Sequence, residues 1–149
     1  TIPRAKSVLL TAGVLGASLL ATVLYSSLVE LSDMEILAPP DIPEDIIFPG
    51  AAAVFTYEAL ALWTPFTEEV FFRGFVLAGL VPRLGAGRAM VASALIFSAF
   101  HVSIGLIVPI FITGLLLAWL YHRTGSLWAS VAAHAGQNTL AITLTSFGV

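Results

Sequence analysis

Six ionisable side chains and one amide interrupt stretches of the chain that are otherwise strongly apolar. Ionisable residues in such a setting are energetically expensive and are functional candidates by default. A carboxylate beside an imidazole can take a proton from a shared water. A second imidazole with a carboxamide can donate hydrogen bonds to a carbonyl oxygen on which charge develops. This combination predicts attack of water on an amide or ester, and the residues are Glu58, Glu68, Glu69, Arg73, His101, His134 and Asn138.

Their spacing on helices divides these residues into pairs. Glu69 and Arg73 are four residues apart, with the Glu nearer the N-terminus, so they share a helix face and can neutralise each other. Glu68 lies about 100° further round the helix and is free to face another direction. His134 and Asn138 have the same four-residue spacing and can point at one spot.

Phe97 and His101 repeat this spacing, which places an aromatic wall one turn below the imidazole. No Ser is obviously placed as a nucleophile. Two histidines and one glutamate are also a set that can bind Zn²⁺, here Glu68, His101 and His134. The HExxH signature is absent, so these ligands would come from three separate helices. The structural alternative is that the Glu–Arg pair joins helices and that each His only packs.

The composition indicates a membrane protein. The 149 residues are 58% hydrophobic and 10% charged, with a mean hydropathy of +0.99, whereas about a quarter of a soluble domain is charged. We therefore expect the lipid bilayer to be the solvent of much of the surface. A net charge of -3 without a basic run argues against a nucleic-acid partner. With no cysteine, the chain has no disulfide, no thiolate nucleophile and no Cys-ligated zinc.

Long apolar segments in lipid should be helices, because their backbone must satisfy its own hydrogen bonds. The first runs over residues 8–29 and is long enough for a membrane span, which favours a retained helix over a signal peptide. An acidic, proline-containing loop follows at 30–46, which divides the chain into segments 1–46 and 47–149. The sequence predicts an all-α transmembrane bundle of about five to six membrane-embedded helices, with further apolar segments at 47–66, 67–82, 89–104, 106–122 and 126–148.

The positive-inside rule gives a topology. If residues 47–66 lie in the interface or re-enter, every loop Lys and Arg falls on one side; if they cross, the basic residues split between both sides. We favour the first alternative. The apolar segments are expected to break at Pro65, at residues 82–88, at Gly105 with Pro109, and at residues 122–126. Counted from the basic loops, Glu68, His101, His134 and Asn138 then lie roughly 16–23 Å from one membrane face. The sequence opens at Thr1 rather than Met, as a piece of a longer protein would.

Three motifs resemble those of the CPBP intramembrane proteases, the family of the type II CAAX prenyl endopeptidase and bacterial Abi-like proteins. "EEVFFRG" at 68–74 is similar to the E-E-x-x-x-R motif, "FSAFH" at 97–101 to F-x-x-x-H, and "HAGQN" at 134–138 to H-x-x-x-[ND]. The connecting "WLYHRTGSLWASVAAH" resembles the bacterial members, and the resemblance covers about residues 60–148.

The resemblance implies an intramembrane endopeptidase that acts on a membrane-associated peptide or protein in a bacterial or archaeal cytoplasmic membrane, with the N-terminus cytoplasmic. By position, Glu68 and His101 would activate water, and His134 with Asn138 would hold the oxyanion. The supporting residues would be Glu69, Arg73 and Phe97.

Several properties stay open at this point. The family has been described both as metal-dependent and as a glutamate-type peptidase without metal, although Asn138 is a poorer metal ligand than Asp. CAAX-like trimming, surface-protein processing and bacteriocin-related roles are all compatible with the motifs. The rival functions are a catalytically silent scaffold or immunity-type partner and, less favoured, a proton-coupled transporter, for which the inverted repeat is missing.

Overall fold

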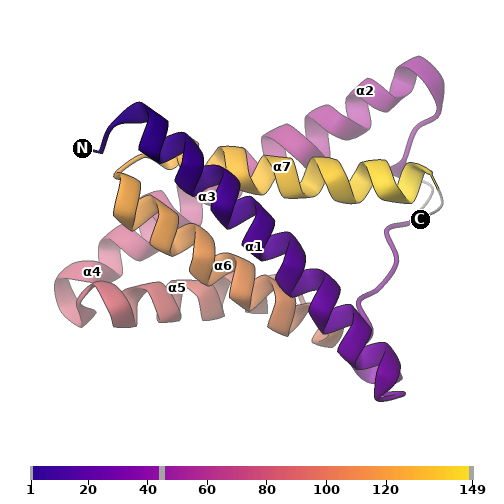
Figure 1. Ribbon diagram of the computed structural model, residues 1–149, viewed down its shortest axis with the longest axis horizontal. Coiled ribbons are helices and arrows are strands. Elements are labelled where there is room, and N and C mark those ends of the chain that lie inside the picture. Colours follow the sequence, from indigo (N-terminus) through magenta and orange to yellow (C-terminus); the bar gives the residue numbers. More distant parts are fainter. Residues whose placement is uncertain (1, 44–45, 148–149) are drawn as a thin grey trace.

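A computed structural model describes residues 2–43 and 46–147 of the chain (Figure 1). Within these residues every regular element is helical, which confirms the all-α prediction. The elements are α1 (Arg4–Leu31), η1 (Glu35–Leu37), η3 (Gly50–Ala52), α2 (Ala53–Thr56), η4 (Tyr57–Trp63), α3 (Thr64–Glu69), η5 (Val70–Leu77), α4 (Ala78–Leu84), α5 (Ala86–Ala99), α6 (Ile104–Thr124) and α7 (Leu127–Ser146).

Two helices of the described chain, α1 and α6, are long and apolar enough to cross a bilayer. Helix α1 shows how such a segment is used. It leaves Leu9, Leu20 and Leu28 exposed, whereas Val14 and Ser18 are buried against the rest of the protein. The large apolar side chains therefore face outward, and a small polar one faces in. The predicted total of five to six membrane-embedded helices goes beyond these two and stays a prediction.

The predicted break at Pro65 is wrong. Residues 50–84, called the central helix here, form one uninterrupted helical run from η3 to α4. Proline normally ends a helix because it lacks an N–H and its ring clashes with the carbonyl four residues earlier. Here Pro65 lies in the first turn of α3, directly after the wider π-helical turns of η4, where hydrogen bonds reach five residues back. The segment 47–66 is therefore not a separate element, and Glu58 shares one helix with Arg73.

The break predicted at Gly105 lies a few residues earlier. Helix α5 ends at Ala99, and residues 100–103 turn the chain into α6, which contains Gly105. Glycine is required at position 105 by tertiary packing instead, because a Cβ there would clash with the carbonyl oxygen of Ala38. The breaks predicted at 82–88 and 122–126 are confirmed, with left-handed φ angles of 72° at Gly85 and 66° at Gly125.

In Figure 1, α1 runs diagonally in front of α7 and beside α6, while α5 lies along the other side of α6. One core cluster joins α1, α6 and α7, and a second joins the central helix, α5 and α6. Two glycines permit close approaches between helices: Gly114 faces Phe97, and Gly136 faces Leu15. This packing brings the middle of the central helix, the end of α5 and the middle of α7 together.

Candidate active site

A buried ion pair braces the centre of the bundle. Glu69 and Arg73 are both fully buried, and Arg73 Nη1 donates to Glu69 Oε1 over 2.7 Å. Arg73 Nη2 also donates to the carbonyl of Gly114 over 3.0 Å, and its guanidinium lies 4.5 Å from the centre of the Phe97 ring. The predicted helical pair is therefore confirmed, and it ties the central helix to both α5 and α6.

His134 lies between the two neighbouring glutamates. Its Nδ1 is 2.9 Å from Oε1 of the buried Glu69, and its Nε2 is 3.7 Å from Oε2 of Glu68. Because the Glu69 carboxylate only accepts hydrogen bonds, Nδ1 carries the hydrogen. Glu69 thus fixes the orientation of the imidazole, while Glu68 keeps 27% of its side chain exposed. The sequence predicted that Glu68 and His134 meet, but not that Glu69 holds the ring.

His101 lies in the turn between α5 and α6. Its Nδ1 is 2.9 Å from the carbonyl oxygen of Phe97, so Nδ1 donates and Nε2 is left as an acceptor. The Phe97 ring packs edge-on against it at 4.9 Å, as the spacing predicts. The next residue, Val102, has a left-handed φ of 50°, which is unusual for a β-branched residue, and its side chain is exposed.

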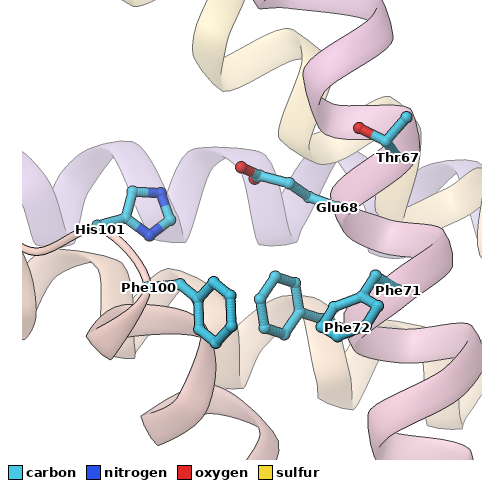
Figure 2. Close-up of a pocket in the computed structure, with 6 residues that line it drawn as sticks. All are labelled: Thr67, Glu68, Phe71, Phe72, Phe100 and His101. Carbon is cyan, nitrogen blue, oxygen red and sulfur yellow. The ribbon is translucent and has the colours of Figure 1, made fainter.

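Among the described residues, His101 lies in the walls of three hollows, one of which has a volume of about 390 Å³ and also includes Leu60 and Asn138. The other two include Glu68 or His134 in their walls. The first, called the Glu68 cleft, has a volume of about 290 Å³ and is lined by Thr67, Glu68, Phe71, Phe72, Phe100 and His101. Figure 2 shows the Glu68 carboxylate extending across this cleft toward the imidazole of His101, with three phenylalanine rings beneath them. The second, called the His134 cavity, has a volume of about 180 Å³ and includes Phe97, His101, His134, Gln137 and Asn138 in its wall. The residues predicted to converge therefore do so.

Asn138 has a partner that the motif does not indicate. Its Nδ2 donates to the carbonyl of Leu60 over 2.8 Å, in the π-helical η4. One amide hydrogen thus joins α7 to the central helix, and the second is left for the His134 cavity. Glu58, by contrast, is exposed and far along the helix from these residues.

The positions of the candidate zinc ligands decide whether they could share one metal ion. In the parts of the chain that the structure describes, no three His, Asp or Glu side chains are close enough to bind one metal ion. The set Glu68, His101 and His134 does not fit zinc in this arrangement.

A polar cluster in the His134 cavity was missed by sequence reasoning. Gln137, on α7, contacts Ser18 on α1 and Thr113 on α6. The signal available in the sequence was the position of Gln137, three residues after His134 and therefore on the same helix face.

Within the described residues, an all-helical bundle with two helices apolar enough to cross a membrane buries Glu69, Arg73 and His134 at its centre. The chain belongs to the type II CAAX prenyl endopeptidase Rce1-like family, whose model matches residues 50–140. This match confirms the family expected from the three motifs and covers all of them. No curated protein and no solved structure matches the chain.

Proposed function

We propose that the protein is an intramembrane endopeptidase in which Glu68 and His101 activate a water molecule. The family is one of CAAX-type proteases, which supports the reaction class. The observation that carries the mechanism is that Glu68 and His101 line one cleft, with His134 beside Glu68.

The two activating groups are both hydrogen-bond acceptors. His101 uses its Nδ1 hydrogen on the Phe97 carbonyl, so its Nε2 offers a lone pair. The Glu68 carboxylate also only accepts. A water between them donates one hydrogen to each and directs its own lone pair at a substrate carbonyl.

Hydrolysis then follows from this geometry. The water oxygen bonds to the scissile carbonyl carbon, and Glu68 takes the proton that the water loses. The carbon–nitrogen bond breaks in the second step, and the same proton passes from Glu68 to the leaving amine. The products are a carboxylic acid and an amine, which together contain all the atoms of the peptide bond and the water, so no other reactant is needed.

His134 is the proposed donor to the oxyanion. His134 Nδ1 donates to Glu69, so a donor at Nε2 requires the imidazolium form, in which both ring nitrogens carry a hydrogen. The Nε2–H, together with the second amide hydrogen of Asn138, then stabilises the tetrahedral intermediate.

The proposed substrate is a membrane-associated peptide segment, either a prenylated CAAX terminus or a bacterial membrane or surface protein. The phenylalanine rings of the Glu68 cleft suit an apolar segment. The proposed location is a bacterial or archaeal cytoplasmic membrane with the N-terminus inside. If each long helical run crosses once, Arg4, Arg83 and Arg123 fall on one side, which supports this orientation.

Comparison of membrane-protein termini tests this function and does not require the substrate to be identified first. Cells carry the wild-type protein, Glu68→Gln, His101→Ala or Glu58→Gln, at matched protein levels. We expect new termini with wild type and with Glu58→Gln, whose carboxylate is exposed on the same helix, and a loss of at least about a thousandfold with the other two.

Persistence of the same termini in folded Glu68→Gln would refute the proposed mechanism. A set of termini that is identical with and without the protein would favour the scaffold alternative. Insensitivity of cleavage to strong chelators, with no zinc by elemental analysis, would support the metal-free version.

A further inference from the structure

Three polar side chains from three helices form a closed ring at the His134 cavity. Ser18 Oγ donates to Gln137 Oε1 over 2.6 Å. That bond uses the only hydroxyl hydrogen of Ser18, so Thr113 is the donor in the 2.7 Å contact between the two hydroxyls. Gln137 Nε2 donates back to Thr113 Oγ1 over 3.5 Å, which closes the ring.

This ring fixes the orientation of the Gln137 amide and leaves one hydrogen over. Ser18 and Thr113 are 2% and 4% exposed, so water does not compete for their hydroxyls. An amide group has two N–H donors, and the hydrogen bonds of the described residues account for one of those in Gln137. Because Gln137 lines the His134 cavity together with His101 and His134, its second N–H is available to a ligand there.

We propose that Gln137 is a substrate-binding residue that donates this N–H to a main-chain carbonyl of the peptide, and that Ser18 and Thr113 are positioning residues that hold it. The proposal rests on the proposed function for the identity of the ligand. A peptide suits the site because the Gln137 N–H can pair with a main-chain carbonyl, while much of the remaining wall is apolar, including Pro39, Leu106, Pro109 and Ile110. An extended peptide at the water-activating residues presents carbonyls along its whole length.

The proposal also gives α1 a role at the site. Ser18 belongs to α1, which lies outside the matched residues 50–140. Ser18 is the buried polar residue of α1, and its hydroxyl contacts Thr113 on α6 and Gln137 on α7. The segment that the family motifs do not cover thus orients a residue next to the motif His134.

Binding is measured separately from cleavage. A fluorescein-labelled peptide that ends in a farnesylated CAAX sequence is titrated onto the detergent-solubilised full chain by fluorescence anisotropy, in the Glu68→Gln background. Gln137→Met keeps the length of the side chain but removes both N–H groups. We expect its Kd for the peptide to rise about tenfold, the effect of one lost hydrogen bond in a poorly solvated site.

Matched variants separate this contact from general damage to the cavity. Thr22 lies on the same wall, but its hydroxyl donates to the backbone carbonyl of Ser18, and Thr22→Val should leave the Kd within about twofold. Thr113→Val breaks the ring and should raise the Kd about threefold, while Thr113→Ser restores it.

A substrate change identifies the carbonyl. Replacing the peptide oxygens one at a time with sulfur, a weaker acceptor, should weaken binding to the Gln137 protein at one position. The same replacement should have no further effect with Gln137→Met. In the Glu68→Gln background, unchanged binding by Gln137→Met, equal weakening by Thr22→Val, or no binding of the peptide to the protein that keeps Gln137 would overturn the proposal. Normal binding in that background, without cleavage of the peptide by the wild-type protein, would count against the proposed hydrolysis alone.

Discussion

Glu68 and Glu69 are neighbours in the sequence, yet the structure gives their carboxylates opposite surroundings. Glu69 is fully buried, with Oε1 2.7 Å from Arg73 and 2.9 Å from His134. Glu68 keeps 27% of its side chain exposed and lines the cleft opposite His101. Because successive helix positions point about 100° apart, one turn supplies both an anchor for a histidine and a free base.

The buried pair is not optimised as a stabilising contact. Among the described residues, Glu69 Oε2 and Arg73 Nε have no hydrogen-bond partner. Buried ion pairs often contribute little net stability, although removing one member leaves a costly isolated charge. The difference between the neighbours supports the proposed division of roles, in which Glu69 and Arg73 hold His134 in place and Glu68 is the proposed base.

The largest expected difference between the surroundings of Glu69 and Glu68 is in stability, and removal of Arg73 should reveal it. Arg73→Leu leaves the Glu69 carboxylate buried without its cation, and we expect the free energy of unfolding in detergent to fall by about 3–5 kcal/mol. Glu68→Leu should change it by less than about 1 kcal/mol, because that side chain is partly exposed. Reversible unfolding followed by circular dichroism measures both values.

A double variant controls for the loss of packing. Glu69→Leu together with Arg73→Leu removes both charges and should recover most of the stability lost in Arg73→Leu. Equal stability of Arg73→Leu and wild type would mean that the Glu69–Arg73 pair does not hold the helices together. The proposed difference between Glu69 and Glu68 would then be refuted.

Local geometry explains which parts of the site were predictable. The Glu69–Arg73 pair and the Phe97–His101 contact follow from four-residue spacing on one helix, which the sequence displays directly. His134 forms its hydrogen bond with Glu69 and is further from Glu68. Which glutamate it contacts depends on the angle between α7 and the central helix. No local pattern encodes that angle, so this contact could only come from the structure.

The errors in the fold have the same origin. Pro65 and Gly105 were interpreted as helix breaks because local rules treat proline and glycine in that way. Pro65 is accommodated after π-helical turns, and Gly105 is required where Ala38 packs against α6. In both cases the residue is explained by its wider structural context rather than by a local helix break. Gly85 and Gly125, which do end helices, were predicted correctly because their left-handed φ angles are local.

Substitution of Gly114 should have a smaller effect, and it tests how closely Phe97 packs over the Glu69–Arg73 pair. A Cβ at this position would lie 2.9 Å from Phe97 Cδ1, so the ring that covers Arg73 must shift. We expect Gly114→Ala to lower the free energy of unfolding by about 1–3 kcal/mol, the usual effect of overpacking. Gly13→Ala is the control, since α1 has open space there and alanine favours a helix. A loss of the same size in both variants would contradict the close packing against Phe97.

Substitution of Asn138 should have the smallest effect on stability, because it removes one hydrogen bond. This residue both joins two helices and lines the His134 cavity. Its Nδ2 joins α7 to Leu60 in the central helix, so Asn138→Leu should lower the free energy of unfolding by about 1 kcal/mol, in addition to its effect on cleavage. Thr139→Val, at the next position, removes a hydroxyl that is exposed and bonded within α7, and should change stability by less than about 0.5 kcal/mol. Because Leu60 lies in the same continuous helix as Glu68, the Asn138 bond also sets the register of α7 against the reacting carboxylate. If Asn138→Leu is as stable as wild type, the amide serves the cavity alone, and the position of Glu68 opposite His134 then depends on the Glu69 anchor.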